Sequence, residues 1–239
     1  MRLKRHCLRL AAAALAAMAV AEPAFAQATA GVGPDVARTA VILTLLAVVP
    51  AILVSMTSFI RIVIVLAMVR HAFGMPETPP NAVLVSLSLF LTAFTMSPVL
   101  NELNRDTVQP LLSGKIGVER AMETGSAPLR KFMLTQTRDA DIESIYAISN
   151  TPLPDRPEQV EILKLAPAFI LNELRVAFTI GFVILLPFLL IDLVVSAILL
   201  SLGMMMVPPT TISLPIKLLM FVLIDGWKLV LEGVLGSFG

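Results

Sequence analysis

The stretch of sequence that decides the fold runs from position 166 to position 200 and reads APAFILNELRVAFTIGFVILLPFLLIDLVVSAILL. Its apolar run is interrupted by Asn172, Glu173, Arg175, Pro187 and Asp192. One membrane-spanning helix needs about 20 residues and two need about 40, so the stretch fits neither number. We therefore expect a bent helix, or a hairpin that packs in protein rather than in lipid.

The composition of the whole chain also indicates an all-α membrane protein. Of the 239 residues, 57% are hydrophobic and 15% are charged. A soluble domain is nearer half apolar and roughly a quarter charged. The net charge is only +1, so no basic excess indicates nucleic acid as a partner.

The first 26 residues have the order of a secretory signal peptide. A basic start is followed by the apolar run Leu10–Ala21 and by small residues at the cleavage positions, Ala24 and Ala26. We expect cleavage after Ala26. The alternative is an uncleaved first transmembrane helix, for which about 12 apolar residues are few. The mature chain would contain no cysteine and one histidine, His71.

This scarcity of reactive side chains argues against an enzyme. Without cysteine there is no thiolate nucleophile and no cysteine-based metal site, and one imidazole cannot supply a two-histidine metal site. An intramembrane aspartyl protease would need a pair of aspartates such as Asp192 and Asp225, but neither has a Gly-x-Gly-Asp setting. We expect no catalytic residue, no metal and no cofactor.

Residues 27–99 are expected to form the first of two apolar helical hairpins. A helix from Ala40 to Val69 would be about 45 Å long, more than the roughly 30 Å hydrocarbon core. It must therefore tilt, kink at Pro50 or project beyond the bilayer. The second helix is expected from Asn81 to about Ser97, with Thr78 as its N-cap and Pro98 as the residue that stops it.

Residues 100–165 differ in kind, because they hold 18 of the chain's 35 charged side chains. We expect a small helical aqueous domain between the two hairpins, and a cleaved signal peptide would place it outside the cytoplasm. Helical spacing gives its candidate core positions, which are Leu129, Phe132, Met133, Ile142, Ile145 and Tyr146. Residues 166–239 are expected to form the second hairpin, with a last helix from Thr211 to about Leu235.

Ionisable residues within the apolar stretches each need a partner or water. They are Arg61, Glu173, Arg175, Asp192, Lys217, Asp225 and Lys228. Glu173 and Arg175 are two positions apart, so they lie on different faces of a helix and need partners elsewhere. Lys217 would lie in the opening turn of the final helix, where an anionic partner such as Glu173 is expected.

Two of these residues have alternative explanations. Lys228 follows Asp225 by three positions and precedes Glu232 by four, so it can pair within its own helix. Lys228 and Arg61 could instead extend their charged ends to a membrane interface.

A loop with three consecutive methionines, residues 203–209, separates the last apolar helices. Gly203 before the methionines and Pro208 and Pro209 after them force a non-helical path. Methionine is unbranched and adaptable, so Met204, Met205 and Met206 of several copies around an axis could form a soft apolar ring that closes a pore. The alternative is an interfacial turn whose methionines enter lipid.

Several blocks of the mature chain resemble the FliP/SctR family of type III export apparatus components, and the resemblance covers nearly all of it. The most specific blocks are TSFIRIVIVL (57–66), PPN (79–81), PFLLIDLVV (187–195), GMMMVPP (203–209) and LPIK (214–217).

The resemblance implies a pore-forming subunit of the flagellar export gate, multi-pass in the bacterial inner membrane at the flagellar basal body. In that family about five copies assemble as a helical funnel with FliR and FliQ, next to FlhB and FlhA, and pass unfolded flagellar subunits. The resemblance also maps the pore gasket onto Met204, Met205 and Met206, and subunit-contact charges onto Glu173 and Lys217.

Two alternatives remain open. One is a virulence injectisome subunit of the same family, which the signal peptide disfavours. The other, from a different class, is a monomeric small-solute carrier. A carrier would bring its charged groups together at one midplane site within a single chain.

Overall fold

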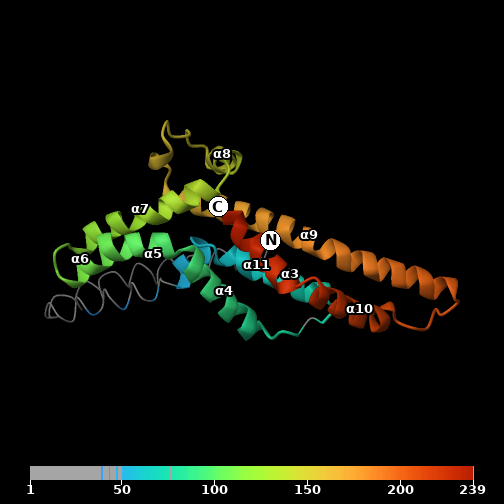
Figure 1. Cartoon of the computed structure of the whole chain (residues 1–239). Helices are drawn as coiled ribbons and strands as arrows, with labels where there is room; N and C mark the ends of the chain where they lie inside the picture. Colours follow the sequence, from blue (N-terminus) through green and yellow to red (C-terminus); the bar gives the residue numbers. More distant parts are fainter. Residues whose placement is uncertain (1–38, 40–42, 44–46, 48–49, 76, 239) are drawn as a thin grey trace, which may run out of the picture. The chain divides into compact units, whose positions relative to one another are not determined.

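The computed structural model describes residues 39, 43, 47, 50–75 and 77–238 (Figure 1). The chain divides into two compact units, Met1–Pro50 and Ala51–Gly239, and the elements below belong to the second. The expected signal peptide and most of the first half of the helix expected from Ala40 lie outside the described residues. Every regular element in the described ranges is a helix, so the all-α expectation is confirmed.

Helices α3 (Phe59–Ala72) and α4 (Asn81–Thr95) follow each other in the chain and pack on each other. The residues before α3 are helical up to Ser55, and the helix is interrupted at positions 56–58. The N-cap of α4 is Pro80, so the expected cap at Thr78 is wrong. Pro80 has an extended backbone, and its carbonyl accepts the first amide hydrogen bonds of the helix.

The chain does not leave the helical path after α4. It bends by 67° and continues as α5 (Ser97–Leu103), a π-helical turn (Asn104–Val108) and α6 (Gln109–Leu112). Pro98 lies in the first turn of α5, where its missing amide hydrogen costs nothing. Pro98, expected to stop the helix that begins at Asn81, therefore lies at the start of α5.

Helices α7 (Val118–Gln136) and α8 (Asp139–Ile148), followed by a 3-10 turn (Pro157–Gln159), pack against the start of α9 (Ile162–Ser201). Three of the expected core positions are buried, namely Met133, Ile142 and Tyr146. Phe132 and Ile145 are partly buried against the same cluster, which also contains Leu165, Ala168 and Phe169 of α9. The charged region thus shares its core with the apolar helix that follows it.

Helix α9 is a single helix of 40 residues with Pro167 and Pro187 inside it, so of the two alternatives for residues 166–200, a bent helix or a hairpin, the hairpin is excluded (Figure 1). Each proline removes one backbone hydrogen bond but does not end the helix, because the flanking turns are held by packing against α3, α7, α8 and α10. At 1.5 Å per residue the helix is roughly 60 Å long, about twice the hydrocarbon thickness. By length and composition it can cross a membrane, and the bent pair of α4 with the helix after it is the other candidate among the described residues.

The helix expected from Thr211 to Leu235 is two helices, α10 (Pro209–Leu223) and α11 (Gly226–Leu235), followed by a 3-10 turn (Gly236–Phe238). The break lies at Asp225, whose φ of 51° is in the left-handed region. At this break Phe221 contacts the rings of Phe73 and Trp227 edge-on, with centroids 4.9 and 5.4 Å away. This aromatic packing leaves no room for a side chain at Gly226.

We expect Gly226→Ala to destabilise the protein by about 1–3 kcal/mol. An added Cβ would lie 2.2 Å from two atoms of the Phe221 ring, which its aromatic neighbours hold in place. Gly233→Ala in the same helix is the matched control, because its Cβ would meet no heavy atom within 4 Å. Thermal unfolding of the detergent-extracted protein measures both, and equal midpoints for the two variants would contradict the packing argument.

Candidate functional site

Helix α9 holds three of the expected charged residues, and each forms an ion pair with a different element. The pairs are Glu173–Arg61 with α3, Arg175–Asp141 with α8 and Asp192–Lys217 with α10. Glu173 and Arg175 thus have separate partners, as their two-residue spacing predicts. The three ion pairs therefore connect α3, α8 and α10 to α9.

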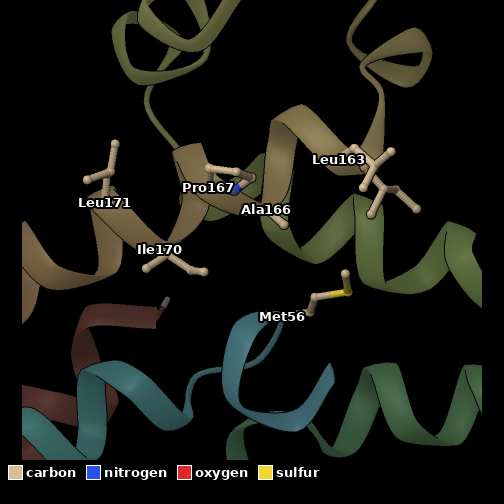
Figure 2. Close-up of a pocket in the computed structure, with 7 residues that line it drawn as sticks. Met56, Leu163, Ala166, Pro167, Ile170 and Leu171 are labelled. Atoms are coloured by element: carbon tan, nitrogen blue, oxygen red, sulfur yellow. The ribbon is translucent and has the colours of Figure 1, made fainter. Parts of the chain in front are cut away.

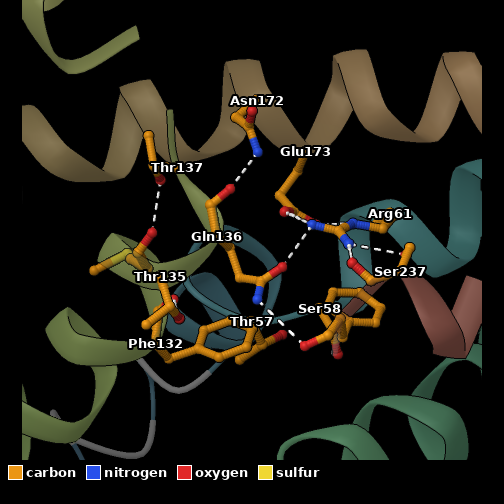
Figure 3. Close-up of polar contacts among 12 residues, drawn as sticks. Thr57, Ser58, Arg61, Phe132, Thr135, Gln136, Thr137, Asn172, Glu173 and Ser237 are labelled. Carbon is orange, nitrogen blue, oxygen red and sulfur yellow. Dashed lines mark hydrogen bonds and ion pairs between the residues drawn. The ribbon is translucent and has the colours of Figure 1, made fainter. Parts of the chain in front are cut away.

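The pair of Arg61 and Glu173 is buried in the protein (Figure 3). The side chains of Arg61 and Glu173 are 2% and 0% exposed. Arg61 Nε donates to Glu173 Oε2 at 2.8 Å, and Nη2 donates to Oε1. A bidentate pair of this kind is the strongest form of carboxylate recognition in proteins. The alternative that Arg61 extends to an interface is therefore wrong.

Residues distant in sequence complete the surroundings of Arg61. Nη2 donates to Gln136 Oε1 at 3.1 Å, and Nη1 donates to the carbonyl and Oγ of Ser237 at 2.7 and 2.9 Å. Figure 3 shows Gln136 between Arg61 and Asn172, whose Nδ2 donates to the Gln136 carbonyl. The sequence analysis missed Gln136 and Ser237, which lie 75 and 176 positions from Arg61 and leave no spacing signal.

Lys217 is buried in α10 and pairs with Asp192, so the expected Glu173–Lys217 pair is wrong. Its Nζ donates to Asp192 Oδ2 at 2.6 Å and to the Ala72 carbonyl at 2.9 Å. Positions 173 and 192 are roughly 28 Å apart along α9, and α10 returns beside the later one because it follows the end of α9 directly. Within one chain, then, both charges of the expected subunit contact already have partners.

The remaining charges lie nearer the surface. Arg175 donates to both carboxylate oxygens of Asp141, at 2.7 and 2.9 Å, and so fixes α8 on α9. Lys228 is exposed and lies 3.9 Å from Glu232, which confirms pairing within its own helix. Asp225 occupies the break before α11, where its role is a backbone one.

The methionine loop has a rigid base and exposed side chains. Gly203 has a φ of 74°, and the amides of Gly203 and Met204 bond to the carbonyls of Leu200 and Leu199, which is a Schellman C-cap for α9. Pro208 and Pro209 start α10. Between these ends Met204, Met205 and Met206 are 43%, 81% and 95% exposed.

An apolar groove of about 500 Å³ lies along the start of α9 (Figure 2). The residues that line it are Met56, Ile162, Leu163, Ala166, Pro167, Ile170 and Leu171. None of these side chains can donate a proton, and their one potential metal-ligand atom is the thioether sulfur of Met56. In the described part of the chain no three His, Cys, Asp or Glu residues form a potential metal site.

The model of the FliP family matches residues 42–234 of the chain. The "Flagellar biosynthetic protein FliP" of Pectobacterium carotovorum subsp. carotovorum is 51% identical over 201 residues, covering 84% of this chain and 78% of the relative. The protein of the same name from Bacillus subtilis (strain 168) is 44% identical over 197 residues, or 82% and 89%. That from Buchnera aphidicola subsp. Baizongia pistaciae is 49% identical, and this chain spans 56% of its length.

Proposed function

Because the chain belongs to the FliP family, we propose that it is a pore-forming subunit of the flagellar type III export gate. In this role it passes unfolded flagellar subunits across the bacterial inner membrane at the flagellar basal body. The partners are other copies of the chain, about five in all, together with FliR, FliQ, FlhB and FlhA. The relatives' shared name favours the flagellar branch over the injectisome.

The exposed methionine loop is the observation that carries this proposal. Met205 and Met206 make few contacts within the chain although both are apolar, and the capped end of α9 fixes the direction in which they project. Around a common axis such loops would supply unbranched, adaptable side chains that fill a pore without a fixed shape. They would also yield to passing chains of varied sequence.

The outer faces of two helices support assembly in a lipid membrane. On α4 two hydroxyl side chains lie on the buried face beside Leu84, and Ser88 and Thr92 donate to the carbonyls of Leu84 and Ser88. Phe90 and Phe94 of the same helix are exposed. Helix α9 exposes a further series of apolar side chains, among them Phe178, Phe182, Leu190 and Leu193. Apolar surface of this extent marks contact with lipid or with other subunits.

The buried ion pairs disfavour a monomeric carrier. A carrier site would bring charges together around one solute cavity. Here Glu173 and Asp192 are far apart on α9, each is paired with a cation, and the groove near the start of α9 is lined by apolar side chains. These paired charges therefore join helices to each other at separate positions along α9 and do not converge on one cavity.

The test is ion leak through the purified particle, obtained by co-expressing the chain with its neighbouring export subunits. Replacing Met204, Met205 and Met206 by alanine should raise the leak by roughly tenfold or more, because three long side chains leave the constriction in each copy. Met122→Ala is the control, since Met122 is exposed on α7, away from the loop. A monomer or dimer whose leak does not change would contradict the proposal.

A further inference from the structure

The segment Ser237–Phe238, near the carboxyl end of the sequence, closes the site around Arg61. Both hydrogen bonds of Arg61 Nη1 go to Ser237, one to its carbonyl at 2.7 Å and one to its Oγ at 2.9 Å. The Phe238 ring centroid lies 3.9 Å from Arg61 Cζ, and the Phe238 carbonyl accepts from Gln136 Nε2 at 3.4 Å. The other walls of the site come from α3, α7 and α9.

The core residues Glu173 and Gln136 accept hydrogen bonds from only some of the donors of the Arg61 guanidinium. Glu173 and Gln136 occupy Nε and Nη2, which leaves the two donors of Nη1 for Ser237. An arginine keeps its charge at any physiological pH, so it cannot escape burial by losing a proton. A buried charged donor without an acceptor is strongly destabilising. The aromatic face of Phe238 adds a further favourable contact for the cation.

We infer that Ser237–Phe238 is a closing latch for the helical core. The ion pair that joins α3 to α9 is complete only when this segment is seated, although it lies 176 positions after Arg61. The core around Arg61 can therefore close only after residues 237 and 238 have been made and have folded back onto it. This inference does not depend on export or on the number of copies in the assembly.

Removal of residues 237–239 tests the latch directly. The readout is the half-life of the full chain against a protease in detergent, which reports the population of opened molecules. We expect the deletion to shorten the half-life by roughly tenfold or more, since it leaves Nη1 unpaired. Phe238→Ala should give part of this loss, while Phe90→Ala, which removes a ring that is 77% exposed, should stay within about twofold of the unmodified chain. An unchanged half-life after the deletion would overturn the latch.

A second background separates the latch from simple packing. In the double variant Arg61→Met/Glu173→Met the core carries no charge to satisfy, so deletion of 237–239 should lose most of its effect. Equal shortening in both backgrounds would overturn the inference. If the double variant does not fold, Arg61→Lys takes its place, because an ammonium lacks the planar fork that reaches Glu173 and Ser237 together. In the Arg61→Lys background the deletion should then shorten the half-life by a smaller factor than it does in the chain with Arg61. An equal shortening would again overturn the latch.

Discussion

Glu173→Ala is expected to lower the free energy of unfolding by about 3–5 kcal/mol, because it leaves the Arg61 guanidinium buried without its carboxylate. Glu173→Gln should recover the smaller part of that loss. It restores the shape of the side chain and one acceptor but not the negative charge. The thermal unfolding midpoint of the detergent-extracted protein, or its resistance to protease, measures the loss.

Glu123→Ala is the matched control for this variant. Glu123 also lies on a helix and pairs with an arginine, Arg120, but both side chains are more than half exposed. An exposed pair of this kind contributes at most about 1 kcal/mol. If the Glu173 and Glu123 variants lost similar stability, the buried pair would not be the connection between α3 and α9 that its geometry indicates.

The second large effect concerns the pair that holds α10 against α9. We expect Asp192→Asn to cost about 3 kcal/mol and Lys217→Met about 1 kcal/mol, although both remove the same ion pair. The difference arises from burial, since the Lys217 side chain is 5% exposed and that of Asp192 is 36% exposed. In Asp192→Asn the buried ammonium keeps the Ala72 carbonyl and a neutral amide oxygen but no negative charge, whereas in Lys217→Met the partly exposed carboxylate can recover water.

The double variant Asp192→Asn/Lys217→Met checks this explanation. Once the buried cation is gone, the loss of Asp192 should add little, so the double variant should be about as stable as Lys217→Met alone. Losses that simply add would show that the two side chains act independently. Unfolding of all three variants is measured under the same detergent conditions.

Sequence reasoning succeeded where the determining interactions are local. The separate partners of Glu173 and Arg175 follow from a two-residue spacing on a helix. The burial of Met133, Ile142 and Tyr146 follows from helical periodicity. Both predictions needed only the geometry of a single helix.

Prediction from sequence failed where a contact depends on the path of the whole chain. The partner of Lys217 depends on where α10 lies beside α9, which in turn depends on a continuous helix through Pro187 and on the turn at Gly203. The break at Asp225 does have a local signal, which the sequence prediction did not use: Asp225-Gly226 is a dipeptide typical of turns, and aspartate tolerates the left-handed conformation. The partners of Arg61 are brought to it by tertiary packing alone.

The length of α9 changes what a hydropathy profile of this chain can mean. A helix of roughly 60 Å cannot lie wholly in hydrocarbon about 30 Å thick unless it is strongly tilted. Whatever part of it lies beyond the lipid still carries apolar side chains, and neighbouring protein must shield these from water. Hydropathy along α9 therefore adds together the surface covered by lipid and the surface covered by neighbours. The number of apolar residues in α9 therefore indicates how much of its surface is covered by lipid or protein, and it does not give the number of times that the chain crosses the membrane.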